Sequence, residues 1–343
     1  MKKLLNTLFV TQADTYLSLN GDNVVVLQKE KQLARIPLHH LESIVTFSHT
    51  GASPALMGYC AEKNISIVFL SPNGKFQARV TGKSKGNVLL RKEQYRKSDN
   101  LKASCRIARN FIEGKVYNNK WMVERAIRDN RSRVDIKQLR VVSNDLSKLI
   151  KEIKSCDNLN SLRGLEGQAA FTYYQVFNKM ILQQKQDFYF NARSRRPPLD
   201  RVNSMLSFAY TLLANDVESA LESVGLDAQV GFLHRERSGR PSLALDMMEE
   251  LRGVVADRFV LSLINRKVMS KGDFVKKENG AFWMTDAARK KFLTTWQNRK
   301  KEQFTHPYLK EKIPWGLVPY TQSLLLARYL RGDSKIYPPF LWK

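Results

Sequence analysis

An acidic side chain lies inside an otherwise apolar helical stripe in the segment SLRGLEGQAAFTYYQVFNKM, residues 161–180. Glu166 follows Leu162 by four residues and precedes Ala169 by three, so all three share one face of the predicted helix. A glutamate is seldom buried unless it is paired with a cation or coordinates a metal. The segment alone leaves two interpretations equally open: a buried salt bridge with an arginine, or a ligand to a bound cation.

The segment VGFLHRERSGRPSLALDMMEELRG, residues 230–253, adds an imidazole and two carboxylates. His234 follows an apolar run, and Asp246 and Glu249 lie three residues apart on a predicted helix. Two carboxylates this close repel each other, which favours a cation bound between or near them. The alternatives are a histidine that is hydrogen-bonded in the core, and a solvated acidic helix face that pairs with Arg252.

Together these segments offer a mixed set of oxygen and imidazole ligands: Glu166, His234 and either Glu249 or Asp246. Carboxylates select hard cations such as Mg²⁺ or Mn²⁺, and one imidazole favours Mn²⁺ without excluding Mg²⁺. Such a cation beside arginines suits phosphodiester chemistry, because it can polarise a phosphoryl oxygen and lower the pKa of an attacking hydroxyl. We therefore predict these four side chains as catalytic residues.

The charge balance predicts a polyanionic partner. The 343 residues include 57 Lys and Arg against 32 Asp and Glu, which gives a formal net charge of +25 at pH 7. Such an excess neutralises phosphates and releases condensed counterions, so we expect a nucleic acid to bind. The alternatives are positive charge that keeps the protein soluble, or docking on anionic lipid. No stretch is long and apolar enough to predict a membrane span.

Two loops carry arginines that suit phosphate contacts. RSRRPP, residues 193–198, places three arginines before a rigid pair of prolines, and RERSGR, residues 235–240, follows His234 directly. Arginines on a loop stiffened by proline make good phosphate clamps; ion pairs at the surface are the alternative. The predicted DNA-binding residues are Arg193, Arg195, Arg196, Arg235, Arg237 and Arg240.

Two domains of different character are predicted to position these side chains. Residues 1–85 are predicted to form short strands, with a hairpin at Asn20–Asn23, and residues 86–99 a basic hinge. From residue 100 to 343 the apolar spacing changes to the helical period, interrupted by a small hairpin at Asn279-Gly280. Helices are predicted at about 100–130, 134–155, 161–184, 200–222, 243–268, 285–300 and 317–332. The sequence therefore predicts an α+β fold.

Four separated segments resemble the signature segments of the CRISPR spacer-acquisition integrases, the Cas-one endonuclease family. They are SLRGLEGQAAFTYY, RSRRPPLDRVNSMLSFAY, GFLHRERSGRPSLALDMMEELR and YTQSLLLARYLRG. They occur in order over most of the chain, and the agreement of four segments is more specific than one short motif. The segment LALDMMEELR and the length of the chain resemble those of the subtype I-C branch.

The resemblance implies a β-sandwich-like N-terminal domain for dimerisation, residues 1–85, and a larger all-helical catalytic domain, residues 100–343. It implies that Glu166, His234 and Glu249 hold one Mg²⁺ or Mn²⁺ ion, with Asp246 in support. It also implies a homodimer, two of which clamp a Cas-two dimer in a heterohexameric complex, and it allows a Cas-four-type nuclease as a further partner. The implied reaction joins the 3′-hydroxyl ends of short double-stranded DNA into the repeat array by transesterification, without ATP.

Two other functions are compatible with the same residues. One is a free-standing metal-dependent nuclease or resolvase, and the other is a non-catalytic nucleic-acid-binding scaffold whose acidic cluster is structural. Neither a P-loop nor a GxGxxG pattern occurs, so nucleotide hydrolysis is not expected. Three scattered cysteines, Cys60, Cys105 and Cys156, predict neither a zinc site nor a disulfide framework, and they fit a reducing cytoplasm.

Overall fold

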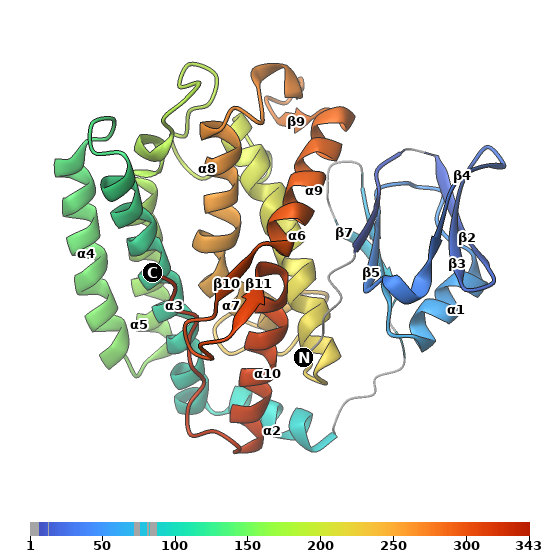
Figure 1. The fold of residues 1–343 in the computed structure, drawn as a ribbon. Helices are drawn as coiled ribbons and strands as arrows, with labels where there is room; N and C mark the ends of the chain where they lie inside the picture. The colour runs from blue at the N-terminus through green and yellow to red at the C-terminus, as the bar shows by residue number, and fades with distance from the viewer. Residues whose placement is uncertain (1–6, 13, 72–75, 81, 83–87) are drawn as a thin grey trace. The chain divides into compact units, whose positions relative to one another are not determined.

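The computed structural model describes residues 7–12, 14–71, 76–80, 82 and 88–343 of the protein. The chain divides into two compact units (Figure 1). The first unit consists of Met1–Lys85, Met284–Glu302 and Pro314–Leu317, and the second of Gly86–Trp283, Gln303–Ile313 and Val318–Lys343. Helices and sheets both occur, so the fold is of the mixed α+β kind that the sequence predicts.

One sheet of the first unit is antiparallel and has three strands, β2 (Thr15–Asn20), β3 (Asn23–Gln28) and β4 (Lys31–Pro37). Asn20 pairs with Asn23 across the turn between β2 and β3, which confirms the predicted hairpin. Three successive valines of β3, Val24, Val25 and Val26, are buried, so both faces of this strand are covered.

The other sheet of this unit has the strand order β1 (Thr7–Val10), β5 (Ser43–Thr46), β6 (Ser66–Leu70) and β7 (Phe76–Val80). Strands β1, β5 and β6 are parallel, and β7 is antiparallel to β6. Helix α1 (Pro54–Glu62) makes the crossover from β5 to β6. Both sheets and α1 contribute to one core, which includes Val10, Leu17, Val24, Val26, Ile44, Leu56, Cys60 and Ile67.

Helix α9 (Asp286–Lys301) groups with the first unit although it follows a long stretch of the second in sequence. The guanidinium of Arg289 lies 5.4 Å from the ring centroid of Phe47, and Gln297 Nε2 donates to the carbonyl of Thr7 at 3.4 Å. The first unit is therefore assembled from separate stretches of the chain.

The second unit is mainly helical. Its helices are α2 (Val88–Asp99), α3 (Leu101–Asp129), α4 (Ile136–Ser155), α5 (Leu159–Tyr174), α6 (Arg201–Ser223), α7 (Ser242–Leu251), α8 (Arg258–Asn265) and α10 (Val318–Arg331). The hairpin predicted at Asn279-Gly280 is confirmed by β8 (Phe274–Lys276) and β9 (Phe282–Met284). A second pair, β10 (Gln303–Thr305) and β11 (Lys312–Pro314), was not predicted, because three-residue strands carry too little alternation to be recognised.

Helix α3 is the longest helix of the second unit and packs against α4, α5 and α7 (Figure 1). Asn100 begins it by accepting a hydrogen bond from the backbone N–H of Ala103 at 3.0 Å. Its buried positions are mostly apolar, but Lys115, Asn118 and Asn119 are buried among them. A long central helix therefore carries polar groups into the interior.

The stretch 86–99, for which the sequence predicts a basic hinge, contains helix α2; Gly86 and Asn87 lie outside the described residues. Leu90 and Gln94 are buried in the middle of this helix, which packs against α3 and α10. Charged side chains on the remaining positions hide this helical pattern in the sequence.

The helix predicted at 243–268 is interrupted. Between α7 and α8 the turn Arg252–Asp257 is π-helical, with backbone hydrogen bonds that span five residues. A β-carbon added to Gly253 would lie 2.4 Å from Asn119 Oδ1, so only glycine lets this turn approach α3 so closely. The turn therefore widens the helix where it meets α3.

Cys60, Cys105 and Cys156 are all free thiols in the structure. In the part of the chain that the structure describes, no helix has the length and apolar character that spanning a membrane requires.

Candidate active site

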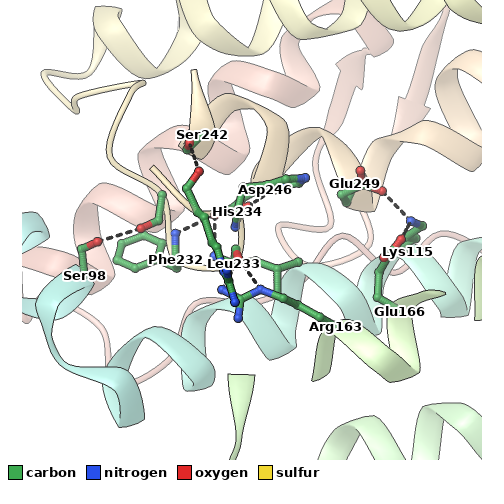
Figure 2. A network of polar contacts seen from close by, with 12 residues as sticks. Ser98, Lys115, Arg163, Glu166, Phe232, Leu233, His234, Ser242, Asp246 and Glu249 are labelled. Carbon is green, nitrogen blue, oxygen red and sulfur yellow. Dashed lines mark hydrogen bonds and ion pairs between the residues drawn. The ribbon is translucent and has the colours of Figure 1, made fainter. Parts of the chain in front are cut away.

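Two carboxylates from separate helices converge on one buried ammonium group (Figure 2). Lys115 on α3 forms an ion pair with Glu166 Oε1 on α5, and its Nζ lies 2.7 Å from Glu249 Oε2 on α7. Arg252 approaches Glu249 from the other side, with NH1 2.6 Å from Oε1. The structure thus brings together Glu166 and Glu249, which are far apart in the sequence, around a single positive charge.

The charges of this cluster stabilise one another. Burial opposes the charge on Lys115, but the carboxylates of Glu249 and Glu166 outweigh it and raise the pKa of the ammonium. Burial likewise opposes the charge on Glu249, but Arg252 and Lys115 lower the pKa of its carboxyl group to about 2, and His234 adds a smaller effect in the same direction. Glu249 and Lys115 are therefore both charged at neutral pH.

One carboxylate oxygen of this cluster depends on a cation. Glu249 Oε2 is buried, and among the described residues its close polar contact is the ammonium of Lys115, at 2.7 Å. Its side chain is almost fully enclosed. A buried carboxylate oxygen without a hydrogen bond is energetically unfavourable unless a cation completes its environment.

His234 is held by Asp246. Its Nδ1 lies 2.5 Å from Asp246 Oδ1, and the Asp246 side chain is completely inaccessible to solvent. The same carboxylate accepts the backbone N–H groups of Phe232, Leu233 and His234 at 2.6, 2.9 and 3.0 Å. Both carboxylate oxygens of Asp246 are therefore engaged in holding the loop and orienting the imidazole. This favours a supporting role for Asp246 over that of a direct metal ligand.

Other helices hold the same loop. On α5, Arg163 Nε and NH2 donate to the carbonyl of Leu233 at 3.0 and 2.7 Å (Figure 2). On α2, Ser98 Oγ donates to the carbonyl of Gly231 at 2.8 Å, and Gln94 Nε2 donates to that of Val230 at 2.8 Å. A β-carbon on Gly231 would lie 2.7 Å from Asp246 Oδ2, so glycine is required there. The loop before His234 is rigidly placed.

The predicted ligands do not form one coordination sphere as they stand. Within the described ranges, no three His, Cys, Asp or Glu side chains are grouped closely enough to hold a metal ion. Glu166 and Glu249 share Lys115, whereas His234 is engaged through Nδ1 with Asp246. The donor chemistry nevertheless fits a hard divalent cation, because both carboxylates already face one cation and the imidazole keeps Nε2 unused among the described contacts.

The predicted DNA-binding arginines fall into two groups. Arg193 is half-buried, and its NH1 donates to Asn203 Oδ1 at 2.7 Å while NH2 donates to Ser207 Oγ at 2.9 Å. Its guanidinium also lies 5.3 Å from the centroid of the Tyr210 ring. Arg193 thus anchors the start of α6, and most of its donors are already used inside the protein.

The other five predicted arginines remain available. Arg195, Arg196, Arg235 and Arg237 are exposed, and Arg240 is half-buried. No hydrogen bond or ion pair of their side chains occurs within the residues that the structure describes. Five cations without internal partners on two loops can therefore contact phosphates.

Sequence reasoning missed Lys115 and Arg163, whereas pairing of the acidic residues of α7 with Arg252 was one of the stated alternatives and occurs at Glu249. A signal for Lys115 exists: it follows Phe111 by four residues and precedes Asn119 by four, inside the buried stripe of α3. A lysine at such a position needs a buried anion, and the partner of Glu166 is this lysine instead of the arginine that the sequence suggested. Arg163 could not be identified in this way, because its partner is a backbone carbonyl.

Similarity to known proteins is consistent over the whole chain. A sequence model of the family described as "CRISPR associated protein Cas1" matches residues 8–298. "CRISPR-associated endonuclease Cas1 2" of Rhodospirillum rubrum is 49% identical over 347 residues, and "CRISPR-associated endonuclease Cas1 1" of Chlorobaculum tepidum is 46% identical over 343; both alignments cover 100% of each chain. A "CRISPR-associated exonuclease Cas4/endonuclease Cas1 fusion" of Geobacter sulfurreducens is 33% identical over 97% of this chain and 60% of the fusion.

Solved structures share the fold at lower sequence identity. A CAS1 protein from Thermotoga maritima superimposes with a TM-score of 0.82 at 20% identity, covering 97% of this chain and 99% of that one. A casposase bound to integration product gives 0.84 at 22% identity, with 98% and 93% covered. A Cas6-RT-Cas1–Cas2 complex gives 0.83 at 22% identity, with 100% of this chain and 36% of that one covered.

Proposed function

This chain belongs to the Cas1 family of CRISPR-associated proteins, and we propose that it is the DNA endonuclease and integrase of CRISPR adaptation. In this reaction the 3′-hydroxyl ends of short duplex DNA attack phosphodiester bonds of the repeat array. A new phosphodiester bond forms as the old one breaks, so no ATP is required. The charge of +25 suits a protein that holds duplex DNA through many phosphates.

One observation carries the catalytic part of this proposal. Glu166 and Glu249, on helices separated in sequence, face the same buried cation near an imidazole that Asp246 orients. Acidic side chains in a strongly basic protein serve phosphodiester chemistry best when they hold a divalent cation. We therefore assign Glu166, His234 and Glu249 as the ligands of one Mg²⁺ or Mn²⁺ ion.

The bound cation would polarise the target phosphate and stabilise the developing charge on the attacking and leaving oxygens. Asp246 fixes His234 so that Nε2, rather than Nδ1, is presented for binding. Arg163 fixes the loop from the opposite side by holding the carbonyl of Leu233. Arg252 keeps Glu249 ionised, and thus ready to bind a cation.

The five arginines without internal partners would hold the DNA backbone. Arg195 and Arg196 occupy the loop before α6, and Arg235, Arg237 and Arg240 occupy the loop directly after His234. Contacts to phosphates fix the position of a duplex without reading its sequence. This arrangement would let the protein recognise the shape and ends of the DNA.

We also propose an assembly and a subtype. Dimerisation through the first unit and binding of two dimers to a Cas2 dimer follow from the family, and the structural likeness to a Cas6-RT-Cas1–Cas2 complex is compatible with this assembly. A Cas4-type nuclease is a further candidate partner, since a Cas4/Cas1 fusion is among the relatives. Placement in the subtype I-C branch rests on the LALDMMEELR segment, and a cytoplasmic location rests on the proposed role.

A strand-joining assay tests the function. Purified protein, its Cas2 partner, labelled duplex DNA with free 3′-hydroxyl ends and a repeat-bearing plasmid are mixed with Mn²⁺, Mg²⁺ or a chelator. We expect joined product only with a metal, and a loss of at least about a hundredfold for Glu166→Gln and His234→Ala. Lys148→Met is the matched control, because Lys148 and its partner Asp145 are both exposed at the surface.

The same assay separates the alternative functions. Cutting of the DNA without joining, even with Cas2 present, would indicate a free-standing nuclease. DNA binding that is unaffected by chelator, together with full insensitivity to the two substitutions, would indicate a scaffold.

A further inference from the structure

We propose that Lys115 is a built-in counter-cation that occupies the metal position of the resting site and gives up its carboxylate contacts when a divalent cation binds. This inference rests on the proposed function, because it concerns the same two carboxylates. It assigns a role to a residue that is neither a metal ligand nor a contact to DNA.

Geometry carries the proposal. Lys115 Nζ contacts Glu166 Oε1 and lies 2.7 Å from Glu249 Oε2, so a single atom faces both carboxylates. A divalent cation ligated by the same two oxygens would lie about 2.0–2.6 Å from each. The ammonium and the metal therefore cannot both keep contacts of this length.

The surroundings of Lys115 explain why a cation is needed there at all times. The Lys115 side chain is 6% exposed, and that of Glu249 is 7% exposed. Arg252 neutralises only one of the two carboxylates, because its contact is to Glu249 Oε1. Without a second cation, Glu166 would face Glu249 across a poorly solvated space, and the like charges would repel.

The side chain of Lys115 is long enough for its ammonium group to move away from the two carboxylates. Four methylene groups join the ammonium to α3, so Nζ can move by rotation about side-chain bonds while the helix stays fixed. Figure 2 shows Lys115 reaching Glu166 and Glu249 from one side of the pair, which leaves the His234 loop on the other. Lys115 would thus hold the two carboxylates in place before binding, and its displacement would lower the apparent affinity for metal.

Binding and stability measurements test this role without an activity assay. We would titrate Mn²⁺ into wild type and Lys115→Met, following free Mn²⁺ by electron paramagnetic resonance, and record Tm in chelator and in Mn²⁺. In chelator, Lys115→Met should have a Tm lower by about 5 °C. It should bind Mn²⁺ at least about tenfold more tightly than wild type, and it should gain more in Tm from Mn²⁺.

Lys148→Met is the control, because Lys148 and its partner Asp145 lie on α4 with side chains 73% and 44% exposed. It should match wild type in both measurements. Equal Mn²⁺ affinity for wild type and Lys115→Met would overturn the counter-cation role while leaving the metal site intact. Weaker binding by Lys115→Met would overturn it too, by showing that the ammonium and the metal cooperate. Absence of Mn²⁺ binding in every variant would refute the metal site itself.

A second pair of variants covers the case in which Lys115→Met does not fold. Glu166→Gln removes one carboxylate charge, and Lys115→Met/Glu166→Gln removes the ammonium as well. The double variant replaces the Lys115–Glu166 ion pair by two neutral groups and leaves Glu249 paired with Arg252, so it should be about as stable in chelator as Glu166→Gln. If Lys115 competes with metal, the double variant should bind Mn²⁺ more tightly than Glu166→Gln; equal or weaker binding contradicts the proposal.

Discussion

The Nδ1 atom of His234 lies 2.5 Å from Oδ1 of Asp246, and that carboxylate also binds three consecutive backbone N–H groups of the loop that carries the histidine. A single buried side chain therefore sets both the path of the loop and the direction of the imidazole. This relationship separates two of the three acidic residues of α7: Asp246 faces the loop, whereas Glu249, one turn later, faces Lys115 and Arg252.

Replacing Asp246 should affect stability more than replacing His234. Asp246→Asn puts an amide where four donors now point, so we expect the free energy of unfolding to fall by about 3 kcal/mol, with loss of strand joining. His234→Ala should lose joining but change stability by less than about 1 kcal/mol, because its side chain is 23% exposed. Urea unfolding of both variants checks the contrast, and equal stability of Asp246→Asn and wild type would contradict it.

Replacing Arg163, which is not a proposed metal ligand, should loosen the loop that carries His234. Arg163→Met leaves the carbonyl of Leu233 without its two donors, and we expect strand joining to slow by about tenfold or more. Mn²⁺ affinity of the two carboxylates should change little. Single-turnover joining rates and Mn²⁺ titration provide the measurement, and a purely structural role would instead appear as a lower Tm with normal joining by the folded fraction.

The loop arginines should differ in what they contribute. Arg195→Glu and Arg196→Glu should weaken DNA binding across sequences and reduce the salt dependence of binding by about one ion each. Arg193→Ala should instead lower the free energy of unfolding by about 2 kcal/mol, because Asn203 and Ser207 lose a buried partner. Fluorescence anisotropy in a salt series and urea unfolding together distinguish these outcomes; unchanged affinity for both charge reversals would show that this loop does not contact DNA.

Glu250, next to the site on α7, should make stability depend on pH. Burial raises the pKa of its carboxyl group to about 7, although hydrogen bonds from Tyr337, Phe340 and Gln322 oppose the rise. Because the folded-state pKa exceeds the ordinary value of 4.5, the contribution to stability is fully present below pH 4.5 and is lost as pH rises to about 7. The loss amounts to roughly 3 kcal/mol.

Glu250→Gln should flatten this dependence, which urea unfolding between pH 4.5 and 8 would measure. His306 acts in the opposite direction, because burial lowers its pKa from 6.5 to about 4, and its contribution is lost as pH falls through that range. Both proteins contain His306, so the difference between their pH profiles isolates Glu250. Parallel profiles would show that Glu250 is not protonated near pH 7.

Much of the fold follows from local pattern. The hairpin at Asn20–Asn23 was predicted because turn residues separate two apolar runs, and the stripe from Leu162 to Tyr173 was predicted because its spacing is helical. The π turn at Arg252–Asp257 was not predicted, since its apolar residues continue the helical period and the cause is contact between Gly253 and α3. Helix α9 grouped with strands that are remote in sequence, and spacing carries no information about such pairing.

Of the candidate site, only the acidic side chains and the histidine were predicted from the sequence. Each could be recognised because an ionisable group at an apolar position needs a partner. Their mutual geometry could not, because it depends on how α3, α5 and α7 pack. The split between Asp246 and Glu249 illustrates this, since both lie on one helix and only the surrounding loop and lysine distinguish them.

The widened turn between α7 and α8 brings two side chains that lie five residues apart to the same neighbour. Residues five apart on a regular α-helix point about 140° away from each other. Here Arg252 lies over the ring of Tyr210, and Asp257 accepts a hydrogen bond from the hydroxyl of the same tyrosine. A regular helix of the same length would therefore turn Arg252 and Asp257 to different sides, and one of them would lose its contact with Tyr210. Only the wide turn lets one tyrosine meet both the cation and the carboxylate.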